Sequence, residues 1–140
     1  ADANDRDGFI QIRRDTLSRV GDLEALLIDD RLPDIPSEFD ALPRLAGRAT
    51  VVIETTQGNL TAVVDGYNAP LTAGAFIDLS LKGFYDGLPF NRAEDFYILQ
   101  TGDPEGPDIG YVDPKTKEER HVPLEIRVPC ETETLYNETF

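Results

Sequence analysis

Apolar residues in the N-terminal stretch recur about every third or fourth position, which predicts an amphipathic helix over residues 5–30. Asp5 or Asp7 is placed to cap its first turn. Gly21 weakens the middle of the helix and marks the position where a break or kink can occur. A lone helix of this length is marginal in water, so the apolar stripe should be buried against a partner surface. The stripe consists of Phe9, Ile12, Thr16, Val20, Leu23 and Leu27.

The next stretch, residues 32–48, has the composition of a linker, because Pro33, Pro36 and Pro43 lie among acidic residues. Apolar side chains continue through it, however, which a free linker would not require. We therefore predict an ordered strap that packs onto the domain that follows. Its apolar residues are Leu32, Ile35, Phe39, Leu42 and Leu45.

Two β-branched runs, residues 49–54 and 60–64, predict a hairpin across Gln57, Gly58 and Asn59. A second helix is predicted over residues 70–82, since a proline in the first turn of a helix loses no hydrogen bond. Either Pro70 or Leu71 lies in that first turn.

The second helix should end at Lys82 and Gly83, a basic residue followed by a glycine. Phe76 and Leu79 are expected to face the sheet. The elements together predict an α+β fold in which one helix packs on antiparallel strands.

Residues 82–103 combine a turn, a strand, a loop and a second strand. Gly87 suits the turn because glycine accepts positive φ. The apolar, β-rich residues 96–101 predict the second strand, on which Ile98 and Gln100 point to the same face. Arg92 directly precedes the loop. The segment therefore offers one guanidinium and one amide near an apolar wall, with no acid–base pair and no nucleophile.

The rest of the chain carries weaker signals. Residues 103–114 are rich in Gly, Pro and Asp and should form a loop. Residues 120–128 are expected to form a strand, which Pro123 confines to an edge or a bulge.

Several motifs occur together between residues 51 and 92: the hairpin, a helix reading AP.T..F..L, the run KGFYDG, and then Phe and Arg. In this order and spacing the chain resembles the cyclophilins, which are peptidyl-prolyl cis-trans isomerases. The resemblance covers about residues 49–104 and continues more weakly to residue 140. The preceding run EFDALPRLAGRAT narrows it to thylakoid-lumen cyclophilins with a helical region ahead of the barrel.

This resemblance implies three segments: residues 1–31 as the C-terminal part of a helical region, residues 32–48 as the strap, and residues 49–140 as the N-terminal part of a cyclophilin-like domain. A barrel of this kind closes with about eight strands. The chain supplies about the first four, so we expect an incomplete antiparallel barrel whose remaining socket residues lie beyond Phe140.

The resemblance also implies site residues. Arg92 matches the catalytic arginine, whose guanidinium donates to the prolyl nitrogen, and Gln100 matches the glutamine that binds the substrate backbone. The substrate-binding positions are Phe90, Phe96 or Tyr97 as the socket aromatic, and Ile98. Which of the two aromatics fills the socket depends on a one-residue slip in the alignment.

The sequence departs from the family pattern beside the arginine. Asn91 replaces a common histidine, and Ala93, Glu94 and Asp95 replace two apolar residues and a proline. Either acidic residue can pair with Arg92 and draw it away from a substrate.

Composition narrows the partners. Twenty-seven acidic and thirteen basic residues give a net charge of −14, which argues against nucleic acid and anionic lipid. No run of eighteen apolar residues is present, so any membrane association would be peripheral, through a protein complex. A single cysteine, Cys130, and a single histidine, His121, argue against a disulfide, a metal site or a cofactor.

Two functions are compatible with these observations. The first is a prolyl isomerase that assists folding or assembly of photosynthetic complexes in the chloroplast thylakoid lumen and acts on proline-containing segments. The second is a non-catalytic accessory or structural subunit bound to photosystem subunits. We expect residues 1–140 alone to be inactive, because the later socket segment is missing.

Overall fold

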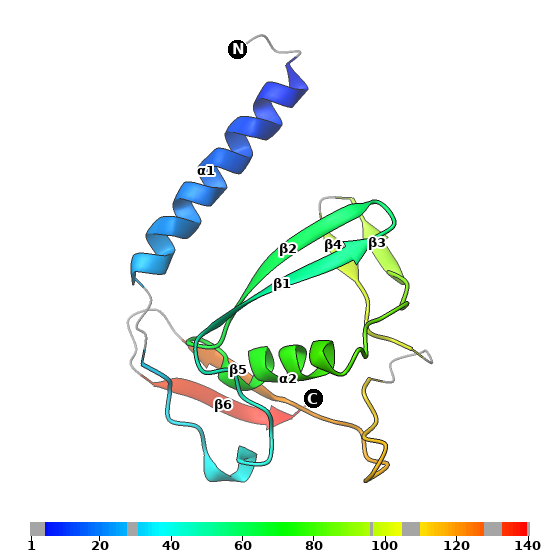
Figure 1. Cartoon of the computed structure of the whole chain (residues 1–140). Helices are drawn as coiled ribbons and strands as arrows, with labels where there is room; N and C mark the ends of the chain where they lie inside the picture. Colours follow the sequence, from blue (N-terminus) through cyan, green and yellow to red (C-terminus); the bar gives the residue numbers. More distant parts are fainter. Residues whose placement is uncertain (1–4, 28–30, 96, 105–109, 128–132, 140) are drawn as a thin grey trace. The chain divides into compact units, whose positions relative to one another are not determined.

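The computed structural model describes residues 5–27, 31–95, 97–104, 110–127 and 133–139 (Figure 1). Cys130 lies outside these ranges. The chain divides into two compact units, Ala1–Asp30 and Arg31–Phe140.

The first unit contains one helix, α1 (Arg6–Leu27). The Gly8 amide donates to Asp5 Oδ1 at 2.8 Å, which confirms Asp5 as the cap. The helix runs through Gly21 without a break. Among the described residues of this unit the stripe is exposed: Phe9 is 68% exposed and Leu27 is 85% exposed. Burial of the stripe against a partner surface stays a prediction.

The second unit begins with the strap, which contains a short 3₁₀ turn, η1 (Ser37–Phe39). The Leu45 amide donates to the Pro70 carbonyl at 3.0 Å, and the ring of Phe39 lies 6.1 Å from that of Tyr136. A Cβ at Gly74 would collide with the backbone of the strap at Pro43 and Arg44. The prediction of an ordered, packed strap is confirmed.

The predicted hairpin is confirmed as β1 (Arg48–Thr55) and β2 (Gly58–Asp65), paired antiparallel. Thr55 pairs with Gly58, so the two turn residues are Thr56 and Gln57, one position earlier than expected. Gly58, at φ +119°, explains the shift, because the chain needs a glycine where the second strand begins.

The second helix is α2 (Pro70–Leu81), with Pro70 in its first turn as predicted. Gly83 at φ +68° ends it, and the Phe84 amide donates back to the Leu79 carbonyl at 3.0 Å, the glycine-based helix end that was expected. The most buried residues lie in the first half of the helix: Pro70, Leu71, Ala73, Gly74 and Ala75.

Phe76 and Leu79, which were expected to face the sheet, are only half-buried. The ring of Phe76 packs instead on Tyr85, at 5.4 Å between centroids. α2 itself lies between the base of the β1–β2 hairpin and the last pair of strands, with contacts to β2 and β5 (Figure 1).

Four further strands complete the described part of the unit. β3 (Arg92–Glu94) pairs with β4 (Ile98–Gln100), and β5 (Pro123–Arg127) pairs with β6 (Thr134–Thr139). The register of β5 shifts between Pro123 and Glu125, so the predicted bulge is confirmed. The sheets formed by the described residues are three separate antiparallel pairs, without a closed barrel among them. This arrangement fits a partial cyclophilin fold.

Candidate functional site

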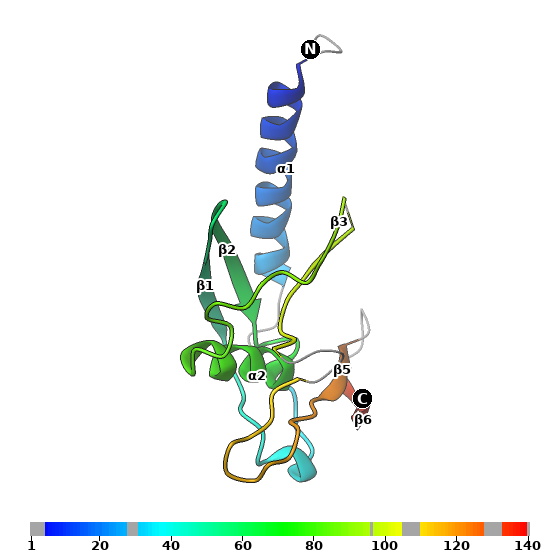
Figure 2. The same ribbon diagram turned by 90° about the vertical axis from the view of Figure 1, so that its right-hand side faces the viewer.

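The β3–β4 hairpin brings the two predicted polar site residues together. Arg92 and Gln100 are direct partners across the antiparallel pair, so their side chains leave the same face. Glu94 and Ile98 are the next partners on that face. The hairpin extends away from α2 (Figure 2).

Local hydrogen bonds fix the open end of this hairpin. The Asn91 amide donates to the Gln100 carbonyl at 3.0 Å, and the Thr101 hydroxyl donates to the Pro89 carbonyl at 2.9 Å. These bonds hold the backbone of Arg92 opposite that of Gln100. This register places the Arg92 and Gln100 side chains on the same face of the hairpin.

The guanidinium of Arg92 is bound to Glu94. Both Nε and Nη2 donate to Glu94 Oε1, at 2.7 and 2.6 Å, and each side chain is 50% exposed. The sequence left Glu94 and Asp95 as alternative partners. Glu94 is the one that pairs because residues two apart on a strand share a face.

The strand that carries Gln100 is shorter than predicted. Of the described residues within the predicted range 96–101, it covers Ile98–Gln100 and leaves out Tyr97, because the Tyr97 amide donates to the Glu94 carbonyl at 3.1 Å in a tight turn at the tip. The start of this strand is therefore set by the turn and not by the start of the apolar, β-rich run.

The predicted apolar positions do not form an enclosed socket among the described residues. Phe90 is 38% exposed and Tyr97 is 76% exposed, while Ile98 is half-buried. Phe96 lies outside the described residues. The assignment of Phe96 or Tyr97 as the socket aromatic stays a prediction.

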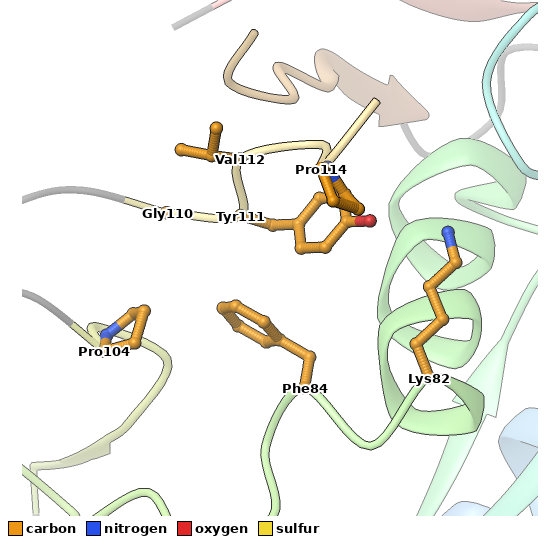
Figure 3. A pocket seen from close by; sticks show the side chains of 7 residues that line it. All are labelled: Lys82, Phe84, Pro104, Gly110, Tyr111, Val112 and Pro114. Atoms are coloured by element: carbon orange, nitrogen blue, oxygen red, sulfur yellow. The ribbon is translucent and has the colours of Figure 1, made fainter. Parts of the chain in front are cut away.

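A pocket of about 540 Å³ lies elsewhere, between the C-terminal end of α2 and the loop that precedes β5 (Figure 3). Its main walls are aromatic: the rings of Phe84 and Tyr111 meet edge to face, with centroids 5.6 Å apart. The lining residues are Lys82, Phe84, Pro104, Gly110, Tyr111, Val112 and Pro114.

Two cations lie over the Tyr111 ring, Lys82 Nζ at 5.4 Å and Arg120 Cζ at 4.8 Å from its centroid. Both are held by Asp78, whose Oδ2 accepts from Lys82 at 2.6 Å and from Arg120 at 2.7 Å. The hydrogen bond from Lys82, and secondarily that from Arg120, lowers the pKa of Asp78 against the opposing effect of burial. These contacts join the end of α2 to the loop that precedes β5.

The sequence did not reveal this second cluster. Lys82 was noted only for ending a helix, although its spacing from Asp78 fits an i,i+4 ion pair. Arg120 lies 42 positions from Asp78 in the sequence, and no local pattern links the two residues. The described residues that line the pocket include no nucleophile paired with a base.

Other kinds of site receive no support from the described residues. They contain no cluster of His, Cys, Asp or Glu able to hold a metal ion. No helix among them has both the length and the apolar character needed to cross a bilayer.

Residues 50–138 match the family described as cyclophilin type peptidyl-prolyl cis-trans isomerase/CLD. The match covers more than half of the chain and agrees with its partial fold, so the chain belongs to this family. The resemblance predicted from the sequence is confirmed.

The relatives of the chain include proteins of photosynthetic organisms. It is 52% identical over 138 residues to a Synechocystis sp. protein named as a thylakoid lumen peptidyl-prolyl cis-trans isomerase, sll0408, covering 99% of this chain and 36% of that protein. It is 39% identical over 142 residues to the chloroplastic peptidyl-prolyl cis-trans isomerase CYP38 of Arabidopsis thaliana, covering 96% and 32%.

A third relative is chloroplastic CYP37 of Arabidopsis thaliana, 32% identical over 138 residues, covering 86% of this chain and 27% of that protein. The chain thus spans about a third of the length of the curated relatives that it matches.

Proposed function

We propose that the protein is a cyclophilin of the thylakoid lumen that isomerises X–Pro bonds, with Arg92 as the catalytic donor and Gln100 as the residue that binds the substrate backbone. The observation that carries this proposal is the pairing of Arg92 with Gln100 on one face of the β3–β4 hairpin. The lumenal location is supported by the names of the relatives.

Isomerisation of an X–Pro bond is favoured by a cationic hydrogen-bond donor at the position of Arg92. Rotation about a peptide bond meets a barrier of about 18–20 kcal/mol, because the C–N bond has partial double-bond character. As the bond twists, the prolyl nitrogen regains its lone pair and becomes an acceptor. A guanidinium that donates to it stabilises the twisted state, and a half-exposed arginine can reach a bound peptide.

The substrate proline would rest on the apolar positions of the same segment, Phe90, Ile98 and either Phe96 or Tyr97. Phe90, Tyr97 and Ile98 form no enclosed socket among the described residues. We therefore expect residues 1–140 alone to give no measurable acceleration, since poor orientation of about 1 Å can cost roughly a hundredfold in rate.

The test is isomerisation of a proline tetrapeptide by the full-length protein and by its Arg92→Ala variant. Loss of a donor to the transition state should lower kcat/KM about a hundredfold. Arg13→Ala, which removes the same charge from exposed α1, is the matched control and should keep full activity. Full activity in Arg92→Ala would remove Arg92 from the mechanism.

A second function is favoured by a separate observation, the exposed apolar stripe of α1, on which Leu23 is 63% and Leu27 is 85% exposed. A stripe of this kind fits an apolar protein surface. On this proposal the protein is an accessory subunit or assembly factor bound to photosystem subunits, and catalysis is secondary.

Replacing Leu23 and Leu27 together by Asp should release the full-length protein from large complexes on a native gel. The matched control replaces Gln11 and Ser18 by Asp, which adds the same charge to the polar side of the helix. Unchanged migration of the Leu variant with its complex would exclude this surface.

A further inference from the structure

The direction of the Arg92 side chain bears on how the proposed isomerase is regulated. Its two bound donors, Nε and Nη2, both go to Glu94, the next residue along β3 on the same face. Among the described residues no hydrogen bond joins the side chains of Arg92 and Gln100, although the two are direct partners across the hairpin. The guanidinium is thus turned along the strand toward the hairpin tip.

Glu94 lies within the proposed site, which makes it more than an ordinary surface partner. Arg92, Glu94, Ile98 and Gln100 all leave the same face of β3–β4. A peptide laid on that face would meet the Glu94 carboxylate together with the guanidinium. Asp95, the adjacent acidic residue, belongs to the turn that closes on Tyr97 and has no ion pair with Arg92.

We propose that Glu94 is a positioning residue that restrains Arg92 and so attenuates the isomerase, an inference that rests on the proposed function. The prolyl nitrogen becomes a good acceptor only when the peptide bond twists. Arg92 therefore gives up its hydrogen bonds to the Glu94 carboxylate and donates to the prolyl nitrogen only as the transition state is approached. A group that opposes only the transition state lowers kcat and leaves KM unchanged.

The size of the effect follows from exposure. Both partners are 50% exposed, and exposed ion pairs of this kind change equilibria by about fivefold at most. Glu94 is therefore a restraint that a substrate overcomes and not a block. Because the pair is exposed, salt should weaken it.

The experiment compares Glu94→Gln with Asp95→Asn in the full-length protein, using an uncharged proline tetrapeptide. Both variants remove one negative charge from the hairpin. Glu94→Gln should raise kcat about two- to fivefold with KM unchanged, whereas Asp95→Asn should match the wild type. Added salt should raise kcat in the wild type and in Asp95→Asn but not in Glu94→Gln.

A second measurement reports the contact itself. The Nε–H signal of Arg92 in NMR should exchange with water faster in Glu94→Gln than in the wild type or Asp95→Asn. The inference is overturned if kcat of Glu94→Gln is unchanged or lower while activity still depends on Arg92. It also fails if both variants respond alike. If neither the wild type nor Glu94→Gln is active, the proposed function is refuted as well. In the other outcomes the protein is active, so the two kinds of failure can be told apart.

Discussion

The start of α2 depends on a carboxylate from a distant strand, and removing that carboxylate should destabilise the domain. Ala69 stands at the cap position and supplies no side-chain acceptor. Glu125 of β5 takes this role instead: Oε1 accepts from the Leu71 amide at 3.0 Å and Oε2 accepts from the Thr72 amide at 2.7 Å. One side chain thereby joins β5 to the helix that carries the core.

The magnitude follows from the surroundings of the two amides. A hydrogen bond to a charged group contributes about 1.5–3 kcal/mol when its loss leaves a buried donor unsatisfied. Leu71 is fully buried, so its amide meets that condition, whereas water can replace the bond at exposed Thr72. The lost charge at the helix N-terminus adds about 0.3–1 kcal/mol. Glu125→Ala should therefore cost about 2–3 kcal/mol, and Glu125→Gln about half of that.

Hydrogen exchange of the Leu71 amide in the full-length protein measures this change locally. A loss of about 2–3 kcal/mol corresponds to exchange about 30- to 150-fold faster, if the opening that exposes this amide is the unfolding of α2 from β5. Glu118→Ala, a change at an exposed position, should stay within about 0.5 kcal/mol of the wild type. An equally small effect of Glu125→Ala would show that the cap does not stabilise α2.

Two further predictions concern the contacts around this helix. Gly74→Ala should lower the unfolding free energy by about 1–3 kcal/mol in urea titrations, because the new Cβ meets the backbone of Pro43 and Arg44. Ser80→Ala on the same helix is the control and should lower the unfolding free energy by less. Burial, and next the charge of Glu125, raises the pKa of Tyr136 from 10.0 to about 12. Because the pKa is raised in the folded protein, the contribution of Tyr136 to stability is complete below pH 10 and is lost as the pH rises to about 12. Tyr136→Phe should therefore flatten the pH dependence of the unfolding free energy, measured in urea, between these values. An unchanged pH dependence in this variant would refute the prediction.

The elements that the sequence predicted well are those fixed by neighbouring residues. Asp5 caps α1 three residues ahead of the amide that it accepts from, and Gly83 ends α2 through bonds to the preceding turn. The bulge at Pro123 follows from the missing N–H of proline. In each case the deciding interaction spans a few positions, so the pattern contains it.

The contacts that the sequence did not reveal join residues far apart in the chain. Glu125 lies 54 positions from Leu71, and Arg120 lies 42 positions from Asp78. A hint was present at Ala69, which cannot cap a helix with its side chain and so requires an acceptor from elsewhere. That hint predicts the existence of a partner, but its identity depends on the tertiary fold.

For the candidate site, the sequence predicted the strand and the face on which residues lie, but not which acidic residue pairs with Arg92. Spacing placed Ile98 and Gln100 on one face and offered two acidic partners for Arg92, and the observed extent of β3 selected Glu94. A loop after Arg92 was predicted, but the hydrogen bond from the Tyr97 amide to the Glu94 carbonyl, which brings its ends together, was not. The place of Phe96 stays a prediction.

Whether a partner protein of the second proposed function permits catalysis depends on which face of the β3–β4 hairpin it covers. Its strands have three residues each, and a two-stranded hairpin by itself is marginally stable in water, so precise placement of a donor requires support from another surface. Ala93 and Leu99 leave the face opposite Arg92, and Leu99 is 52% exposed. A protein surface packed on Leu99 would hold the hairpin still and leave Arg92 open to a substrate. A surface packed on Arg92 and Gln100 would also support the hairpin, but it would exclude catalysis. Whether Arg92 exchanges its hydrogen bonds with a peptide or with a permanent partner therefore decides between an isomerase and a structural subunit.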